Sequence, residues 1–288
     1  MKVIKPIVNI SKLVEEYDVF FISLMGVLHK DAGVKRDAID AIKKLKQKNK
    51  KVVVVTNTPS RVKYIIEDLE KENVDMSLFD GIVSSGEILH YLLKTKSRDF
   101  SSMGNKYYQI GKPEKTGVFD DVDYQKTENI NEADFIYMSH INSSSDRVED
   151  YLQVLEYGIS RNIPFLCAMN DTASYYNGDI GIAPGAIAEQ YALLGGKIIT
   201  VGKPQSQIFD YCLEGLNITD KSKVIMIGDC ITTDIKGANL ASIDSVLISH
   251  GIHVSYLGEG FIPDVERTRN ISSEYEAYPD WVISQFKW

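Results

Sequence analysis

Residues 19–29 read VFFISLMGVLH, and residues 51–59 read KVVVVTNTP. In each stretch, a short run of aromatic or β-branched residues leads into small, polar or turn-forming residues. This pattern predicts a buried strand that ends at a loop. The valines of the second run leave no polar face, so both faces of that strand must be covered. Such strands are typical of a parallel sheet with helices on both sides.

The rest of the chain repeats this alternation of strand and helix. Residues 37–49 carry Ile39, Ile42 and Leu45 with lysines between them, which is the spacing of a helix with one buried face. Alternation over the whole length predicts an α/β fold with a mainly parallel sheet. Further strands are expected over residues 81–84, 106–110, 133–138, 164–167, 197–201, 223–227 and 244–248. Further helices are expected over residues 60–69, 88–93, 146–161, 185–194, 205–216 and 232–240. Residues 170–185, rich in glycine, asparagine and aspartate, are expected to form a loop and a domain junction.

The composition restricts the class of protein. The 288 residues are 44% hydrophobic and 25% charged, which excludes a disordered, collagen-like or coiled-coil chain. The net charge of −8 argues against nucleic acid and anionic membranes as partners, because such a surface repels phosphate groups. An anionic substrate therefore needs a local positive site.

Several features indicate a cytoplasmic protein. The three cysteines form no CxxC pair, so a disulfide framework is not expected. The longest apolar run, residues 19–28, is about half of the roughly 20 residues that a membrane-spanning helix needs. Charges and Pro6 interrupt the first twelve residues, so no signal peptide is expected.

Polar residues follow several of the predicted strands. In an open parallel sheet, ligands bind beyond the carboxyl ends of the strands. There the sequence has Ser23, Thr56-Asn57, Gly202-Lys203, and Asp229 with Asp234. A lysine with hydroxyl and amide donors suits a phosphate, and two carboxylates five residues apart suit Mg²⁺. Each feature alone reads as a turn or a helix cap, but their order along the chain favours a site.

With these motifs, the sequence resembles the haloacid dehalogenase (HAD) superfamily, in its type IIA capped, phosphatase-like branch. The resemblance runs over nearly the whole chain, through Gly26-Val27-Leu28-His29, Thr56-Asn57, Ser84-Ser85-Gly86-Glu87, Pro184-Gly185-Ala186, Gly202-Lys203-Pro204, Ile227-Gly228-Asp229 and Ser249-His250-Gly251. It implies a Rossmann-like parallel-sheet core over residues 1–87 and 183–288. An α/β cap domain is implied over residues 88–182.

The resemblance also implies roles for individual residues. Ser23 takes the position of the family's nucleophilic aspartate, which also binds the metal. Met25 takes the position of a general acid/base whose backbone carbonyl holds the metal. Thr56, with Asn57, matches the residues that hold the phosphoryl group, and Lys203 matches the lysine that neutralises its charge. Asp229 and Asp234 match the acids that hold Mg²⁺, and Asn170-Asp171 matches the cap's specificity loop.

Ser23 decides what chemistry is expected. An aspartate is anionic at neutral pH, whereas a serine hydroxyl is a weak nucleophile that needs an adjacent base. Met25 supplies no such base, so only His29 or Asp229 is a candidate for activating Ser23. A hydroxyl is also a poorer ligand for Mg²⁺ than a carboxylate, so weaker metal binding is expected.

Three hypotheses follow. The first is a phosphatase-like protein, impaired or inactive at Ser23, that keeps a phosphate-binding cleft for a small phosphorylated metabolite. The second is an active phosphohydrolase, either because Ser23 is an engineered substitution or because another group activates it. The third is a non-catalytic interaction protein. A homodimer is compatible with each of them.

Overall fold

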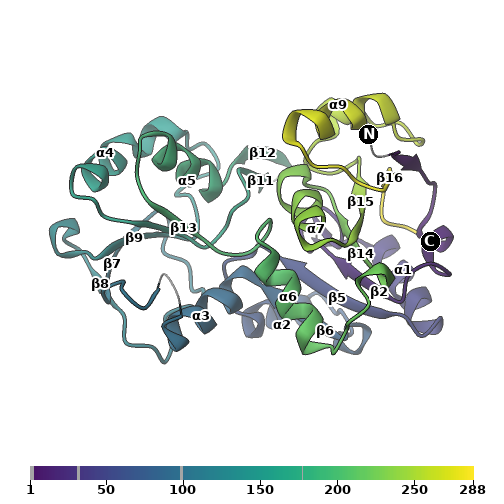
Figure 1. Cartoon of the computed structure of the whole chain (residues 1–288), viewed down its shortest axis with the longest axis horizontal. Helices are drawn as coiled ribbons and strands as arrows, with labels where there is room; N and C mark the ends of the chain where they lie inside the picture. The colour runs from purple at the N-terminus through teal and green to yellow at the C-terminus, as the bar shows by residue number, and fades with distance from the viewer. Residues whose placement is uncertain (1–2, 31–32, 98–99, 177) are drawn as a thin grey trace. The chain divides into compact units, whose positions relative to one another are not determined.

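The computed structural model describes residues 3–30, 33–97, 100–176 and 178–288 (Figure 1). These residues form an α/β protein with two main sheets and two compact units. Unit 1 comprises Met1–Thr56, Ile66–Val83 and Lys203–Trp288, and unit 2 comprises Asn57–Ile65 and Ser84–Gly202. The predicted α/β class, a parallel-sheet core with an inserted second α/β unit, is confirmed.

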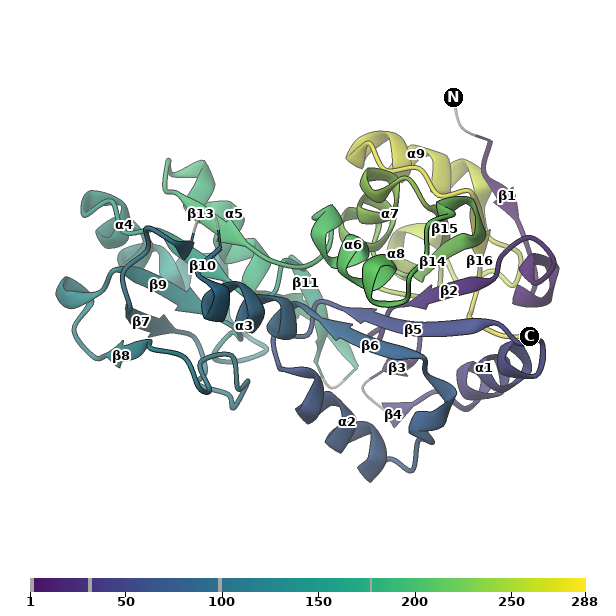
Figure 2. The same ribbon diagram turned by 60° about the horizontal axis from the view of Figure 1, so that its bottom comes forward.

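A seven-stranded sheet contains the predicted buried strand β2 (Val19–Ile22). The strand order is β1 (Lys5–Pro6), β16 (Trp281–Ile283), β15 (Asp244–Ile248), β14 (Val224–Gly228), β2, β5 (Lys51–Thr56) and β6 (Gly81–Ser84). Figure 2 shows β2, β5 and β6 side by side. All residues of β2 and β14 are buried, so these central strands carry no polar face.

The pairing register aligns the ends of three strands. Ile22 of β2 lies opposite Val54 of β5 on one side and opposite Ile227 of β14 on the other, and both pairings are parallel. The carboxyl ends of β2, β5 and β14 therefore meet at one edge of the sheet. The polar residues that follow them in the sequence are brought to the same place.

The chain segments between and beside these strands contain helices. They are α1 (Arg36–Gln47), α2 (Val62–Lys71), α6 (Ser206–Gly215), α7 (Lys236–Ala241), α8 (Val254–Leu257) and α9 (Val265–Tyr275), with the short helices η1 (Ile10–Leu13), η2 (Met76–Leu78), η6 (Lys221–Lys223) and the π-helix η7 (Ile231–Ile235). Helix α1 buries Ala38, Ala41, Ile42 and Leu45, which is the apolar face that its spacing predicted. A small hairpin, β3 (His29–Lys30) and β4 (Gly33–Val34), precedes α1.

Unit 2 contains a five-stranded sheet. Its order is β13 (Ile198–Thr200), β10 (Phe165–Cys167), β9 (Phe135–Met138), β7 (Lys106–Ile110) and β8 (Gln125–Thr127), with parallel pairing throughout. Its helices are α3 (Ser85–Thr95), η4 (Ile130–Glu132), η5 (Val148–Tyr151), α4 (Leu152–Ser160) and α5 (Pro184–Leu193). The core joins the sheet to α4 and α5 through Ile136, Phe165, Leu155, Ile187 and Tyr191.

Among the regions that differ from the sequence prediction, two concern predicted site residues. Residues 170–185, expected to be a loop, contain the antiparallel strands β11 (Ala173–Tyr176) and β12 (Asp179–Ile182) and the start of α5. The tyrosines of β11 have a strand preference that the turn-forming residues around them concealed. The strand before Lys203 does not belong to the seven-stranded sheet, because β13 pairs with β10.

Two sequence expectations concern the whole chain. The predicted cap over residues 88–182 stays a prediction. The two compact units divide near Ser84 and Gly202. In the part of the chain that the structure describes, no helix has the length and apolarity needed to cross a membrane.

Candidate active site

The candidate site begins at the end of β2. The Ser23 backbone N–H donates to the Ile227 carbonyl at 2.9 Å, which extends the β2–β14 pairing by one residue. Because Ile22 is level with Val54, Ser23 lies beside the last residues of β5, where Thr56 is buried. The parallel register thus brings Ser23, Thr56 and Asp229 to one edge of the sheet, as the sequence predicted.

Lys203 reaches this edge from the start of α6. Its side chain is buried, and its Nζ donates to Ser23 Oγ at 3.1 Å, to the Val55 carbonyl at 2.9 Å and to Asp234 Oδ1 at 2.6 Å. An ammonium group has three N–H donors, so each of them has an acceptor here. Lys203 is therefore a charged donor that joins the ends of β2 and β5 to η7.

Asp234 is held on both of its carboxylate oxygens. Oδ1 accepts from Lys203, and Oδ2 accepts from the backbone N–H groups of Asp229 at 3.0 Å and Cys230 at 3.1 Å. A Cβ at Gly228 would overlap the Asp234 carboxyl group, so only glycine lets the carboxylate approach the end of β14 this closely. The Gly228-Asp229 pair and Asp234 therefore form one folded turn.

Asp229 lies against the loop that follows Ser23. Its Oδ2 accepts from the backbone N–H of Ile252 at 2.9 Å, and the side chain is buried. A Cβ at Gly26 would overlap this carboxylate, and Gly26 has a φ of +77°, a conformation that favours glycine. Met25, the residue before it, forms an isolated bridge with His29. The polar cluster is defined here as Ser23, Thr56, Lys203, Asp229 and Asp234.

Two histidines close to this edge have other roles. His29 Nε2 lies 2.7 Å from Glu72 Oε1, and Glu72 Oε2 accepts from the Val34 backbone N–H at 2.7 Å, so His29 helps to hold the β3–β4 hairpin. His253 Nε2 accepts from the Ile231 N–H at 3.1 Å. Burial lowers the pKa of His253 to about 4, which leaves its ring neutral at pH 7.

Three predicted site residues belong to unit 2. The Asn57 carbonyl accepts from Ser85 Oγ at 2.9 Å, Asn170 Nδ2 donates to the Val201 carbonyl at 3.0 Å, and the Asp171 carbonyl accepts from the Gly185 N–H at 3.0 Å. These contacts hold the start of α3 and the loop after β10. The roles that the resemblance implied for Asn57, Asn170 and Asp171 stay predictions.

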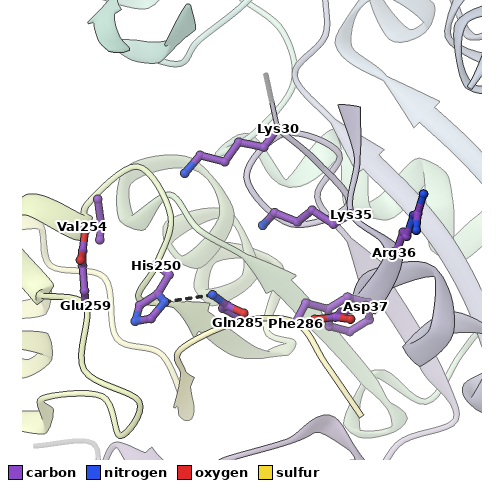
Figure 3. A pocket seen from close by; sticks show the side chains of 9 residues that line it. All are labelled: Lys30, Lys35, Arg36, Asp37, His250, Val254, Glu259, Gln285 and Phe286. Carbon is purple, nitrogen blue, oxygen red and sulfur yellow. Dashed lines mark hydrogen bonds between the residues drawn. The ribbon is translucent and has the colours of Figure 1, made fainter. Parts of the chain in front are cut away.

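Lys35 is a residue of this region for which the sequence predicted no role. This residue occupies the N-cap position of α1, yet its Nζ donates to the Gly26 carbonyl at 2.5 Å. It also lines a pocket of about 640 Å³ in unit 1 together with Lys30, Arg36, His250, Gln285 and others (Figure 3). The sequence signal for an unusual role was the position of this lysine directly before a helix, because the positive end of the helix dipole disfavours a cation there.

The residues implied for Mg²⁺ form an incomplete metal site. Ser23 offers a neutral hydroxyl, Met25 offers only its carbonyl, and both oxygens of Asp234 accept hydrogen bonds. Within residues 3–30, 33–97, 100–176 and 178–288, no three His, Cys, Asp or Glu side chains are grouped so that they could hold a metal ion. This donor set does not fit a tightly held Mg²⁺, which prefers several anionic or neutral oxygen ligands in octahedral geometry.

Solved structures of hydrolases share this architecture. A haloacid dehalogenase-like hydrolase from Brucella suis is 25% identical with a TM-score of 0.82, over 96% of this chain and 98% of that one. A possible sugar phosphatase from Cytophaga hutchinsonii is 21% identical with a TM-score of 0.75, over 99% and 98%. A 4-nitrophenylphosphatase from Thermotoga maritima is 20% identical with a TM-score of 0.68, over 95% and 96%. No curated protein sequence matches the chain.

Family models agree with the structural likeness. A haloacid dehalogenase-like hydrolase model matches residues 20–125, and a HAD-hydrolase-like model matches residues 200–284. The two matches contain the polar cluster and together span more than half of the chain. With the parallel sheet and the order of its motifs, they show that the chain belongs to the haloacid dehalogenase-like hydrolases.

Proposed function

We propose that this HAD-family, phosphatase-like protein binds the phosphate group of a small phosphorylated metabolite and is impaired in hydrolysing it. The observation that carries the proposal is the buried Lys203 ammonium, which donates to Ser23 Oγ at 3.1 Å. The resemblance puts the nucleophile at this position. In this chain, the charged Lys203 donates a hydrogen bond to the neutral hydroxyl of Ser23 at that position.

The contacts around Ser23 argue against its activation. A serine nucleophile needs a neighbouring base that accepts its proton. In the described part of the chain, the side chain that bonds to Ser23 is Lys203. Its ammonium group donates to both Ser23 and Asp234, so it is a hydrogen-bond donor and not a base that could accept the serine proton. His29 bonds to Glu72, and the Met25 side chain carries no proton-transfer group.

The same cluster suits the binding of an anion. Lys203 supplies positive charge, the Thr56 hydroxyl supplies a donor, and both side chains are buried at the end of β5. Charge-assisted hydrogen bonds in a site of low dielectric are among the stronger polar interactions. Mg²⁺ is the cofactor that the family implies, and we propose that it binds weakly because the donor set is incomplete.

Orthophosphate is the simplest probe of this proposal. Isothermal titration calorimetry on the full chain should give a saturable orthophosphate isotherm, and Thr56→Val should weaken it by about tenfold, since one hydrogen bond to a charged group is lost. Thr95→Val, on the exposed end of α3, is the matched control and should bind as the unmodified chain does. The proposal fails if the unmodified chain does not bind orthophosphate with or without Mg²⁺.

Phosphate esters for a turnover screen are chosen from the named activities of the similar structures. Sugar phosphates and 4-nitrophenyl phosphate come first, because phosphatases of these kinds share the fold. Nucleotides and pyridoxal phosphate complete the screen. A slow turnover of any of these that is lost in Ser23→Ala would favour a working serine nucleophile instead.

A further inference from the structure

The side chain of Lys35 points toward the protein, although a lysine at this position is expected to point away from it. Lys35 is the N-cap residue of α1, where the helix dipole disfavours a cation, and its side chain makes no capping hydrogen bond. Its Nζ instead donates to the Gly26 carbonyl at 2.5 Å. The lysine is half-buried, so a compensating interaction is needed for its charge.

Asp229 is an acidic neighbour of this lysine. The Asp229 carboxylate lies so close to Gly26 that a Cβ there would overlap it, and the carbonyl of the same glycine accepts from Lys35. Burial lowers the pKa of Lys35, and the negative charge of Asp229 opposes this change. Gly26 thus lies in contact with both side chains.

The charges near the polar cluster balance in this arrangement. Asp229 and Asp234 carry two negative charges, and Lys203 and Lys35 carry two positive ones. The resemblance implies an aspartate at position 23 and a divalent cation in addition. This chain has the neutral Ser23 at that position, so an added Mg²⁺ would leave an excess of two positive charges.

We propose that the Lys35 ammonium is the built-in counter-ion of Asp229, replacing the positive charge that a divalent cation supplies in this family. The proposal rests on the function proposed above, because the anion that the site then holds without metal is a phosphate group. Lys35 also lines the pocket of Figure 3, where it extends in the same direction as Lys30 above the His250–Gln285 pair.

Calorimetric titration with Mg²⁺ tests the proposal directly. Lys35→Gln keeps a donor for the Gly26 carbonyl but removes the charge, so Mg²⁺ affinity should rise by about tenfold or more, given the strength of charge interactions near a protein surface. Lys35→Arg should bind Mg²⁺ as weakly as the unmodified chain. Arg36→Gln is the matched control: it removes another cation of the same pocket and should leave Mg²⁺ affinity unchanged.

Lys35→Met provides a second neutral variant, in case one substitution disturbs the fold, and circular dichroism and the unfolding midpoint report on folding. Folded Lys35→Gln and Lys35→Met chains with unchanged Mg²⁺ affinity would overturn the proposal. So would tight Mg²⁺ binding by the unmodified chain that Lys35→Gln does not improve.

Orthophosphate binding in EDTA separates this inference from the proposed function. The unmodified chain should bind orthophosphate without divalent metal, and Lys35→Gln should bind it about tenfold more weakly. If orthophosphate binds only when Mg²⁺ is present, the Lys35 proposal is wrong and the proposed function stands. If orthophosphate does not bind under either condition, the proposed function fails, and the Mg²⁺ titrations still decide the role of Lys35.

Discussion

The Lys203 ammonium lies 3.1 Å from the Ser23 hydroxyl and 2.6 Å from the Asp234 carboxylate. Lys203 thereby links residues that are far apart in the sequence and buried at one edge of the sheet. These hydrogen bonds fix the orientation of the ammonium group, and its partner at position 23 is a neutral hydroxyl. In the function proposed above, the ammonium supplies the positive charge that a phosphate needs, and Ser23 stands where the resemblance implies an anionic nucleophile.

Lys203→Met should destabilise the fold as well as weaken anion binding. Removing one partner of a buried ion pair leaves an uncompensated charge, here on Asp234, and typically costs about 3–5 kcal/mol. Urea unfolding followed by circular dichroism measures this change in the free energy of unfolding. The double variant Lys203→Met/Asp234→Asn should be more stable than Lys203→Met alone, and a double variant that is less stable would contradict the ion-pair explanation.

Gly26→Ala should disturb Asp229. The substitution forces a side chain into a backbone conformation at φ +77° and into the space of the Asp229 carboxylate, so we expect a loss of more than about 1–2 kcal/mol. Gly178→Ala is the matched control, since Gly178 also has a positive φ but no atom within 4 Å of the added Cβ. Equal losses in the two variants, measured by urea unfolding, would show that the approach of Asp229 to Gly26 has no energetic consequence.

The stability of the protein should fall as the pH drops from about 6.5 to about 4. The pKa of His253 is lowered to about 4 by burial, whereas an unfolded histidine titrates near 6.5. Between these values the unfolded chain binds a proton that the native state does not, so the free energy of unfolding decreases, by about 3 kcal/mol at most. Above pH 6.5 this contribution is constant.

His253→Gln tests the source of this pH dependence. Glutamine keeps an acceptor for the Ile231 N–H but does not titrate, so the variant should lose less stability than the unmodified chain between pH 6.5 and 4. Urea midpoints measured across this range provide the comparison. Parallel curves for the two proteins would assign the pH dependence to other groups.

The sequence predicted the α/β class and the strands that carry the site, because apolar runs such as those of β2 and β5 have a local signal. The position of Lys203 beside Ser23 also followed from the motif order, and the structure brings the two together. The role of the predicted site residues in binding or catalysis stays a prediction.

The rest depends on contacts between distant parts of the chain. The residues of β13 read as a strand, but its pairing with β10 in the five-stranded sheet has no local signal. The β11–β12 hairpin was read as a loop because residues 170–185 are rich in glycine, asparagine and aspartate. No role was predicted for Lys35, because its inward direction depends on the Gly26 turn.

The central claim is that hydrolysis is limited at Ser23 in a site that otherwise holds phosphate. The most direct measurement is the turnover of 4-nitrophenyl phosphate with Mg²⁺ by the unmodified chain, by Ser23→Asp and by Ser23→Asn, which is neutral and serves as the control. The account predicts turnover in Ser23→Asp alone. Met25 should limit the rate, because general acid catalysis of leaving-group departure is worth roughly 10²–10⁴-fold. Efficient turnover by the unmodified chain that Ser23→Ala removes would contradict the account, as would a folded, Mg²⁺-binding Ser23→Asp that stays inert.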